Sequence, residues 1–77
     1  GIKIYPSPAS TEIHIDLTEN SKPIEGLRIV LINGQVLKHY LKTDRIIDIS
    51  TLIEGVYILQ IELASGLQIN KRFLIIR

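Results

Sequence analysis

The sequence predicts a small all-β domain, built as an antiparallel sandwich of about seven strands. Apolar residues make up 45% of the chain and are mostly Ile, Leu and Val, which favour strands. Short stretches alternate between apolar and polar residues with a period of two, as half-buried strands do. Turn-forming residues separate these stretches about every 8 to 12 residues, and no stretch shows a helical period. This combination is typical of an immunoglobulin-like sandwich.

The chain is long enough for one domain with one core. A chain of 77 residues is expected to unfold with a free energy of about 4 to 12 kcal/mol. We therefore predict that residues 1–77 form a single domain. Gly1 fits a natural internal residue, and it fits equally a remnant of excision from the end of a larger polypeptide. No apolar run approaches the roughly 20 residues of a transmembrane helix.

Composition argues against several classes of partner and site. Nine Lys and Arg against eight Asp and Glu leave a net charge of +1, which gives no long-range field for nucleic acid or an anionic membrane. The absence of Cys excludes disulfides, zinc–thiolate sites and thiol nucleophiles. His14 lies on a polar face between two acids and has only His39 as a second imidazole, which favours a solvated His over a metal ligand. We predict no metal and no other cofactor.

The N-terminal third is predicted to hold two strands. Residues 2–5 alternate, and Pro6 and Pro8 then end the strand because they lack amide donors and force extended geometry on their neighbours. We interpret them as a rigid exit from an edge strand, in preference to a ligand for proline-binding domains. Residues 11–17 alternate again, and a polar, turn-like stretch follows over residues 18–23.

A hairpin is predicted in the middle of the chain. Residues 26–32 and 35–41 flank Asn33-Gly34, the strongest short-range hairpin signal. A two-residue type I′ loop would fix the register of the two strands. The core face would then hold Leu31 opposite Val36, Ile29 opposite Lys38, and Leu27 opposite Tyr40, and the other face Ile32 opposite Gln35, Val30 opposite Leu37, and Arg28 opposite His39.

A short strand over residues 45–49 is predicted to lead into a corner. Asp48 can bond the backbone locally and turn the chain, and Leu52 is expected to close the core from that side. Gly55 follows as the residue expected to take a positive φ. The hydroxyl of Tyr57 could reach back to the corner, as in the tyrosine corner of sandwich domains.

The C-terminal third is predicted to be a second hairpin. Residues 55–63 form a long alternating strand, Gly66 closes the loop, and a last strand runs to Arg77. Lys71 interrupts the alternation, which predicts a bulge. The apolar run 73–76 is expected near an open sheet edge, where weak self-association or strand addition could occur. The residues predicted to be buried together are Ile29, Leu31, Val36, Tyr57, Leu59, Ile61, Phe73 and Ile75.

The sequence does not predict an enzyme. Asp and Glu residues are scattered singly over turns and polar faces, with no pairing that the predicted fold would bring together. No Gly-rich phosphate loop and no plausible Ser-His-Asp arrangement is present. We expect the domain to act through a binding surface, or by being recognised.

Several stretches in order resemble the type A C-terminal sorting domain of type IX secretion substrates, also called the Por secretion system tail. The resemblance covers essentially the whole chain, with Ser7 where the family usually has Asn and Arg72 where a second Lys is common. The stretches are residues 4–9, 13–15, 33–37 and 47–61, Gly66, and residues 71–75. The residues that carry the motif are Pro6, Pro8, Gly34, Asp48, Leu52, Gly55, Tyr57 and Gly66.

The resemblance implies a secretion address that follows an N-terminal cargo domain. The cargo would pass through the periplasm, cross the outer membrane through the type IX machinery, and reach the cell surface or the medium. A sortase-like protease of the outer membrane would then remove the tail. The alternative is a stand-alone adhesive or carbohydrate-binding sandwich, for which the aromatic material, Tyr5, Tyr40 and Tyr57, is thin.

The candidate recognition segment lies within residues 66–77. Two cations stand there beside apolar strand residues, a mixture suited to pairing with a receptor that has an acidic rim. The other interpretation is that the strand only completes the sandwich and carries cations that block aggregation. The candidate binding residues are Lys71, Arg72, Phe73, Leu74 and Ile75.

Overall fold

The computed structural model describes residues 2–17 and 23–77, and these ranges contain seven strands and no helix. Most of the turn predicted over residues 18–23 lies outside them, as does Gly1. With no helix in these ranges, none is available to cross a membrane. The strands are β1 (Ile2–Tyr5), β2 (Glu12–Leu17), β3 (Ile24–Val30), β4 (Val36–Tyr40), β5 (Ile46–Asp48), β6 (Gly55–Leu63) and β7 (Gln68–Ile75).

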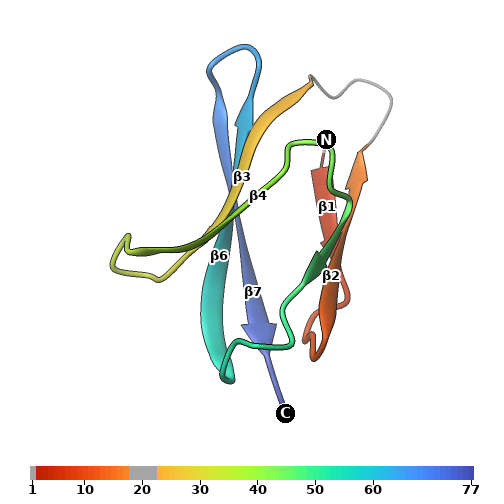
Figure 1. The fold of residues 1–77 in the computed structure, drawn as a ribbon, viewed down its shortest axis with the longest axis vertical. Helices are drawn as coiled ribbons and strands as arrows, with labels where there is room; N and C mark the ends of the chain where they lie inside the picture. Colours follow the sequence, from red (N-terminus) through yellow and green to blue (C-terminus); the bar gives the residue numbers. More distant parts are fainter. Residues whose placement is uncertain (1, 18–22) are drawn as a thin grey trace.

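The strands form two antiparallel sheets that lie as two layers (Figure 1). One sheet has three strands in the order β1-β2-β5, and the other has four in the order β4-β3-β6-β7. The prediction of an all-β sandwich is therefore confirmed. β7 is an edge strand of the four-stranded sheet, with β6 on one side.

The core consists of the side chains that alternate inward from both sheets. Ile29, Leu59 and Ile61 have no exposed surface, and Tyr57, Phe73 and Ile75 are also buried. Of the residues predicted to be buried together, only Leu31, which is half-buried, and Val36 are not. Burial of a leucine-sized side chain stabilises the fold by about 1.5–3 kcal/mol, so these residues dominate its stability.

The β3–β4 hairpin departs from the predicted register at its loop end. Ile29 pairs with Lys38 as predicted, but a bulge follows and Val30 pairs with Val36. No non-glycine residue described has a positive φ, and Gly34 has φ 92°, so the predicted type I′ loop is wrong. The N–H of Gly34 donates to the Leu31 carbonyl at 2.8 Å, as in a longer loop with a glycine bulge. Val36 therefore lies beside Val30 on the face away from the core, and it is 43% exposed.

The β6–β7 hairpin uses the same loop geometry without a bulge in its strands. Gly66 has φ 90°, and its N–H donates to the Leu63 carbonyl at 2.9 Å. The register runs unbroken from Gly55 opposite Ile75 to Glu62 opposite Gln68, so the bulge predicted at Lys71 is wrong. Lys71 pairs with Leu59 and is half-buried. On an edge strand a Lys can occupy an inward position, because its stem packs on the core while its ammonium group reaches water past the edge.

The corner between β5 and β6 forms as predicted. The Asp48 carboxylate accepts a hydrogen bond from the Ser50 N–H at 2.9 Å, and the Leu52 N–H donates to the Ile49 carbonyl at 3.0 Å. Gly55 has φ 152°. The buried Tyr57 donates its hydroxyl to the Ile53 carbonyl at 2.6 Å, which confirms the contact expected of a tyrosine corner.

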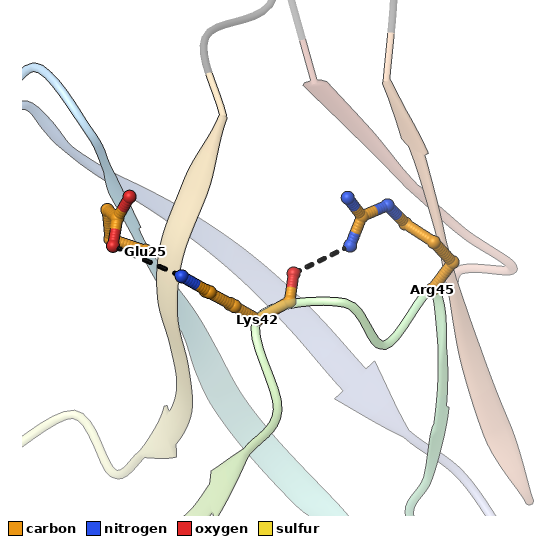
Figure 2. A network of polar contacts seen from close by, with 3 residues as sticks. All are labelled: Glu25, Lys42 and Arg45. Carbon is orange, nitrogen blue, oxygen red and sulfur yellow. Dashed lines mark hydrogen bonds and ion pairs between the residues drawn. The ribbon is translucent and has the colours of Figure 1, made fainter.

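A small polar network holds the crossover from β4 to β5 (Figure 2). The Lys42 ammonium lies 3.6 Å from the carboxylate of Glu25 in β3. The backbone carbonyl of Lys42 accepts a hydrogen bond of 2.9 Å from the Arg45 side chain. Both side chains of the ion pair are about half exposed, which limits its contribution to stability. The network places the chain where it enters β5 in the other sheet.

Candidate functional site

The predicted recognition segment divides between the two faces of β7. Phe73 and Ile75 are buried in the core, with 2% and 1% of their surface exposed. Arg72 and Leu74 alternate with them and are exposed on the outer face of the four-stranded sheet. Only these two residues and the half-buried Lys71 can present their side chains to a partner while the domain stays folded.

An apolar surface surrounds Arg72 on that outer face. In the neighbouring strand β6, Val56 lies opposite Leu74 and Ile58 lies opposite Arg72. Val56 and Leu74 are each 38% exposed, which is a substantial exposure for apolar strand residues. We call this surface the outer patch; it consists of Val36, Val56, Ile58, Leu74 and Arg72. These apolar residues gathered on one outer sheet face make the outer patch the candidate binding site.

Arg72 differs from the other arginines of the chain in its hydrogen bonding. Arg28 donates to the Gln60 side chain at 2.7 Å, and Arg45 donates to two backbone carbonyls. Arg77 donates to three carbonyls. Within residues 2–17 and 23–77, the side chain of Arg72 makes no hydrogen bond and no ion pair. Its guanidinium is therefore available to a carboxylate on a partner.

The C-terminal end of the β7 edge is closed by the chain between β1 and β2. Ala9 donates its N–H to the Leu74 carbonyl at 2.8 Å and accepts from the Ile76 N–H at 3.0 Å. Ala9 thus forms a parallel bridge with Ile75. The expectation that the sheet edge is open over residues 73–76 is therefore wrong for this part of β7. Pro6 and Pro8 lie in the connection that carries the chain from the three-stranded sheet to this edge.

Arg77 fastens the same end of the sandwich. Its Nε donates to the Leu52 carbonyl at 2.9 Å. Its Nη1 donates to the Ser10 carbonyl at 2.6 Å, and its Nη2 donates to the Ile49 carbonyl at 2.6 Å. One guanidinium therefore joins the end of β7 to both the β1–β2 connection and the β5–β6 corner. Sequence reasoning missed this role, because a single Arg after an apolar run carries no signal for partners so distant in sequence.

The exposed face of the three-stranded sheet carries an aromatic pair. The rings of Tyr5 and His14 stack with centroids 5.1 Å apart, and His14 Nε2 lies 3.3 Å from the Glu12 carboxylate. In the part of the chain that the structure describes, no group of three or more potential ligands is placed to hold a metal.

Tyr40 is half-buried and donates its hydroxyl to the Asp48 carbonyl at 3.2 Å. Burial and the Asp48 and Asp44 carboxylates raise the pKa of Tyr40.

A family model described as the secretion system C-terminal sorting domain matches residues 3–76. The chain belongs to this family. It is a sorting signal of type IX secretion, which implies an N-terminal cargo, an interaction with the secretion machinery, and export toward the cell surface or the medium. Sorting domains of this family act as signals and not as enzymes. No curated protein matches the chain.

The motif residues of this sorting domain build its turns, corner and packing. Gly34, Gly55 and Gly66 supply the positive φ angles of three turns. The Asp48 carboxylate accepts from the backbone of the corner, and Tyr57 donates to it. Leu52 packs against the core, and the exposed Pro6 and Pro8 precede Ala9 at the β7 edge. The motif therefore specifies the fold of the sorting domain, and the groups free to bind a partner lie mainly outside it.

Proposed function

We propose that this domain forms the C-terminal end of a larger secreted protein and directs it across the outer membrane. The cargo passes through the periplasm, the type IX machinery reads the folded tail, and a sortase-like protease then removes it. In this role the domain is a substrate of the machinery and performs no chemistry. The machinery reads the outer patch, and Arg72 and Leu74 are the side chains of β7 that it contacts.

The observation that carries this proposal is the combination of exposure and lack of partners at Arg72. Of the five candidate residues, Phe73 and Ile75 are core residues, and Lys71 is half-buried on the inner side. Arg72 is exposed, unpaired among the described residues and bordered by Ile58 and Leu74. An arginine beside apolar residues is a common centre of protein interfaces, because its stem packs while its guanidinium pairs with a carboxylate.

The arrangement of the chain leaves this surface accessible when cargo is attached. Ile2 begins β1 at one end of the sandwich, and the chain leaves β7 at the opposite end (Figure 1). Cargo joined before β1 would therefore extend away from the end that Arg77 fastens. This geometry supports recognition of the tail while a folded cargo precedes it.

The test is export of a fluorescent protein fused to residues 2–77 and directed to the periplasm of a bacterium with type IX secretion. The test variant carries Arg72→Thr and Leu74→Thr, which keep strand propensity. The matched control carries Lys3→Thr and Ile46→Thr, which remove an exposed cation and an exposed apolar residue from the other sheet. We expect export of the wild-type and control fusions and retention of the test variant.

Each outcome has a distinct meaning when circular dichroism shows that both variants are folded. Retention of the wild-type fusion in the periplasm would refute the sorting function of this chain. Export of the Arg72→Thr/Leu74→Thr variant at the wild-type level would refute recognition through the outer patch. Mass spectrometry of the exported wild-type protein tests the proteolytic step, for which we expect the released cargo to lack residues of the tail.

A second candidate function is carbohydrate binding, and the Tyr5–His14 stack is the observation that favours it. Tyr5 is 50% exposed, so its ring could contact a sugar face. Tyr40 and Tyr57 donate their hydroxyls to backbone carbonyls, and Tyr57 is buried. Binding to a glycan array that is lost on Tyr5→Ala would support this function, and a wild-type domain that binds no glycan would remove it.

A further inference from the structure

We propose that the open part of the β7 edge, from Gln68 to Arg72, accepts an extended acidic segment of the secretion machinery as an additional strand. This proposal rests on the proposed function and specifies how the tail is read. Strand addition supplies main-chain hydrogen bonds, and the flanking side chains select the partner. The segment would extend the four-stranded sheet beyond β7.

The backbone direction of β7 is fixed by its contact with Ala9. The Leu74 carbonyl and the Ile76 N–H bond to Ala9, so both point away from β6. Successive residues of a strand direct their N–H and C=O groups to opposite sides. The backbone groups of Gln68, Asn70 and Arg72 therefore also point to the outer edge, where no described residue pairs with them.

The length of the open edge is limited at both ends. Ala9 occupies the edge beside Ile75, and at the other end β7 begins at the loop of Gly66, which leads into it from β6. The available stretch is about five residues, or roughly 17 Å at the rise of an antiparallel strand. A partner therefore needs one short extended segment, and a longer strand would collide with the β1–β2 connection.

Charge selects an acidic segment over a second copy of this domain. Residues 67–77 contain Lys71, Arg72 and Arg77 and no acidic residue. A second copy paired antiparallel over residues 68–72 would place Gln68 opposite Arg72, so it would add two more cations to this edge and supply no carboxylate for Arg72. A carboxylate on the added strand would instead pair with the guanidinium of Arg72, which has no side-chain partner in residues 2–17 and 23–77. On the added strand, the other side chains that face the same way as this carboxylate would lie beside the apolar residues of the outer patch.

The test is an Asn70→Pro variant of the tail, compared with Asn70→Ala in the same export fusion. The Asn70 N–H points outward, so a Pro there removes a donor from the open edge and leaves the hydrogen bonds to β6 in place. Asn70→Ala removes the same side chain and keeps the donor. We expect export of Asn70→Pro to fall about tenfold, as the loss of main-chain hydrogen bonds to a partner would give, and that of Asn70→Ala to stay near wild type.

Two further variants keep the test decisive. Gln68→Pro removes the next outward donor and replaces Asn70→Pro if that variant unfolds, as judged by circular dichroism. Arg72→Glu tests the charge, with Arg72→Lys as its control, and we expect only the glutamate to abolish export.

Wild-type export of both folded proline variants would overturn strand addition. The outer patch would still stand or fall on the Arg72→Thr/Leu74→Thr variant, so the two proposals fail separately. Normal export of Arg72→Glu would overturn the acidic partner. Sedimentation that shows a dimer of the wild-type domain and a monomer of Asn70→Pro would assign the edge to a second copy and overturn the proposal.

Discussion

Replacement of Arg77 by Ala should destabilise the sorting domain far more than replacement of any other exposed cation. The guanidinium of Arg77 donates to the carbonyls of Ser10, Ile49 and Leu52 at 2.6–2.9 Å. These carbonyls belong to two loops that meet at the end of β7. Without the side chain, the loops lose their common donor, and the hydrogen bond from the Ile49 N–H to the Thr11 carbonyl at 2.9 Å still joins them directly. The Ala9 bridge still joins one of them to β7.

The magnitude follows from the number and exposure of these hydrogen bonds. A hydrogen bond from a charged donor contributes about 1.5–3 kcal/mol where it is shielded from water. Only the bond to Ile49 is partly buried, and the bonds to Ser10 and Leu52 are exposed. We therefore expect a loss of about 1.5–3 kcal/mol in total. Against a free energy of unfolding of about 4 to 12 kcal/mol, this is a large fraction.

The assay is urea denaturation of the isolated domain, followed by far-ultraviolet circular dichroism. Arg72→Ala is the matched control, because it removes the same side chain from an exposed position without a described partner; we expect a change within about 0.5 kcal/mol. Arg77→Lys should recover only part of the loss, since one ammonium cannot reach three carbonyls in the directions of a guanidinium. If Arg77→Ala and Arg72→Ala unfold at the same urea concentration, the role assigned to Arg77 is wrong.

Three other predictions concern the core, the corner and acid stability. Leu59→Ala should cost about 2–5 kcal/mol in urea denaturation, because Leu59 has no exposed surface. Tyr57→Phe should cost about 0.5–1.5 kcal/mol by the same assay, since it removes the 2.6 Å bond to the Ile53 carbonyl and keeps the packing. The side chain and backbone N–H of Ser50 lower the pKa of Asp48 below its ordinary 3.8. A lowered pKa stabilises the folded state above pH 3.8, and this contribution is lost as the pH falls through the folded pKa. Asp48→Asn should therefore show a weaker decline in urea stability below about pH 4 than the wild type does.

Local signals in the sequence were sufficient to predict the strands and the corner. Alternation located the strands, and Asp48, Gly55 and Tyr57 predicted a corner that the structure contains. The errors arose where one local signal fits two geometries. Asn33-Gly34 suits a type I′ loop and also a longer loop that ends in a glycine bulge, and only the pairing of Val30 with Val36 distinguishes them.

The position of a strand within its sheet is not readable from alternation, and this explains the other errors. Lys71 interrupts the alternation and so predicts a bulge, whereas at the edge of a sheet a cation is tolerated on the inward face. The contacts of Ala9 and Arg77 join residues separated by most of the chain, so no local pattern predicts them. Alternation alone does, however, divide the candidate segment into the core residues Phe73 and Ile75 and the exposed residues Arg72 and Leu74.

The division between fold-building and exposed groups limits how this signal can be read. Tyr57 is buried, the motif glycines act through their backbone angles, and the Asp48 carboxylate bonds to the corner backbone. A partner that contacted these groups strongly would have to disrupt the turns that they form. The groups left to it are the backbone of an edge strand and a few side chains beside it. Strand addition needs only a correctly positioned exposed edge. The motif residues position that edge, because they fix the turn before β6 and the turn between β6 and β7.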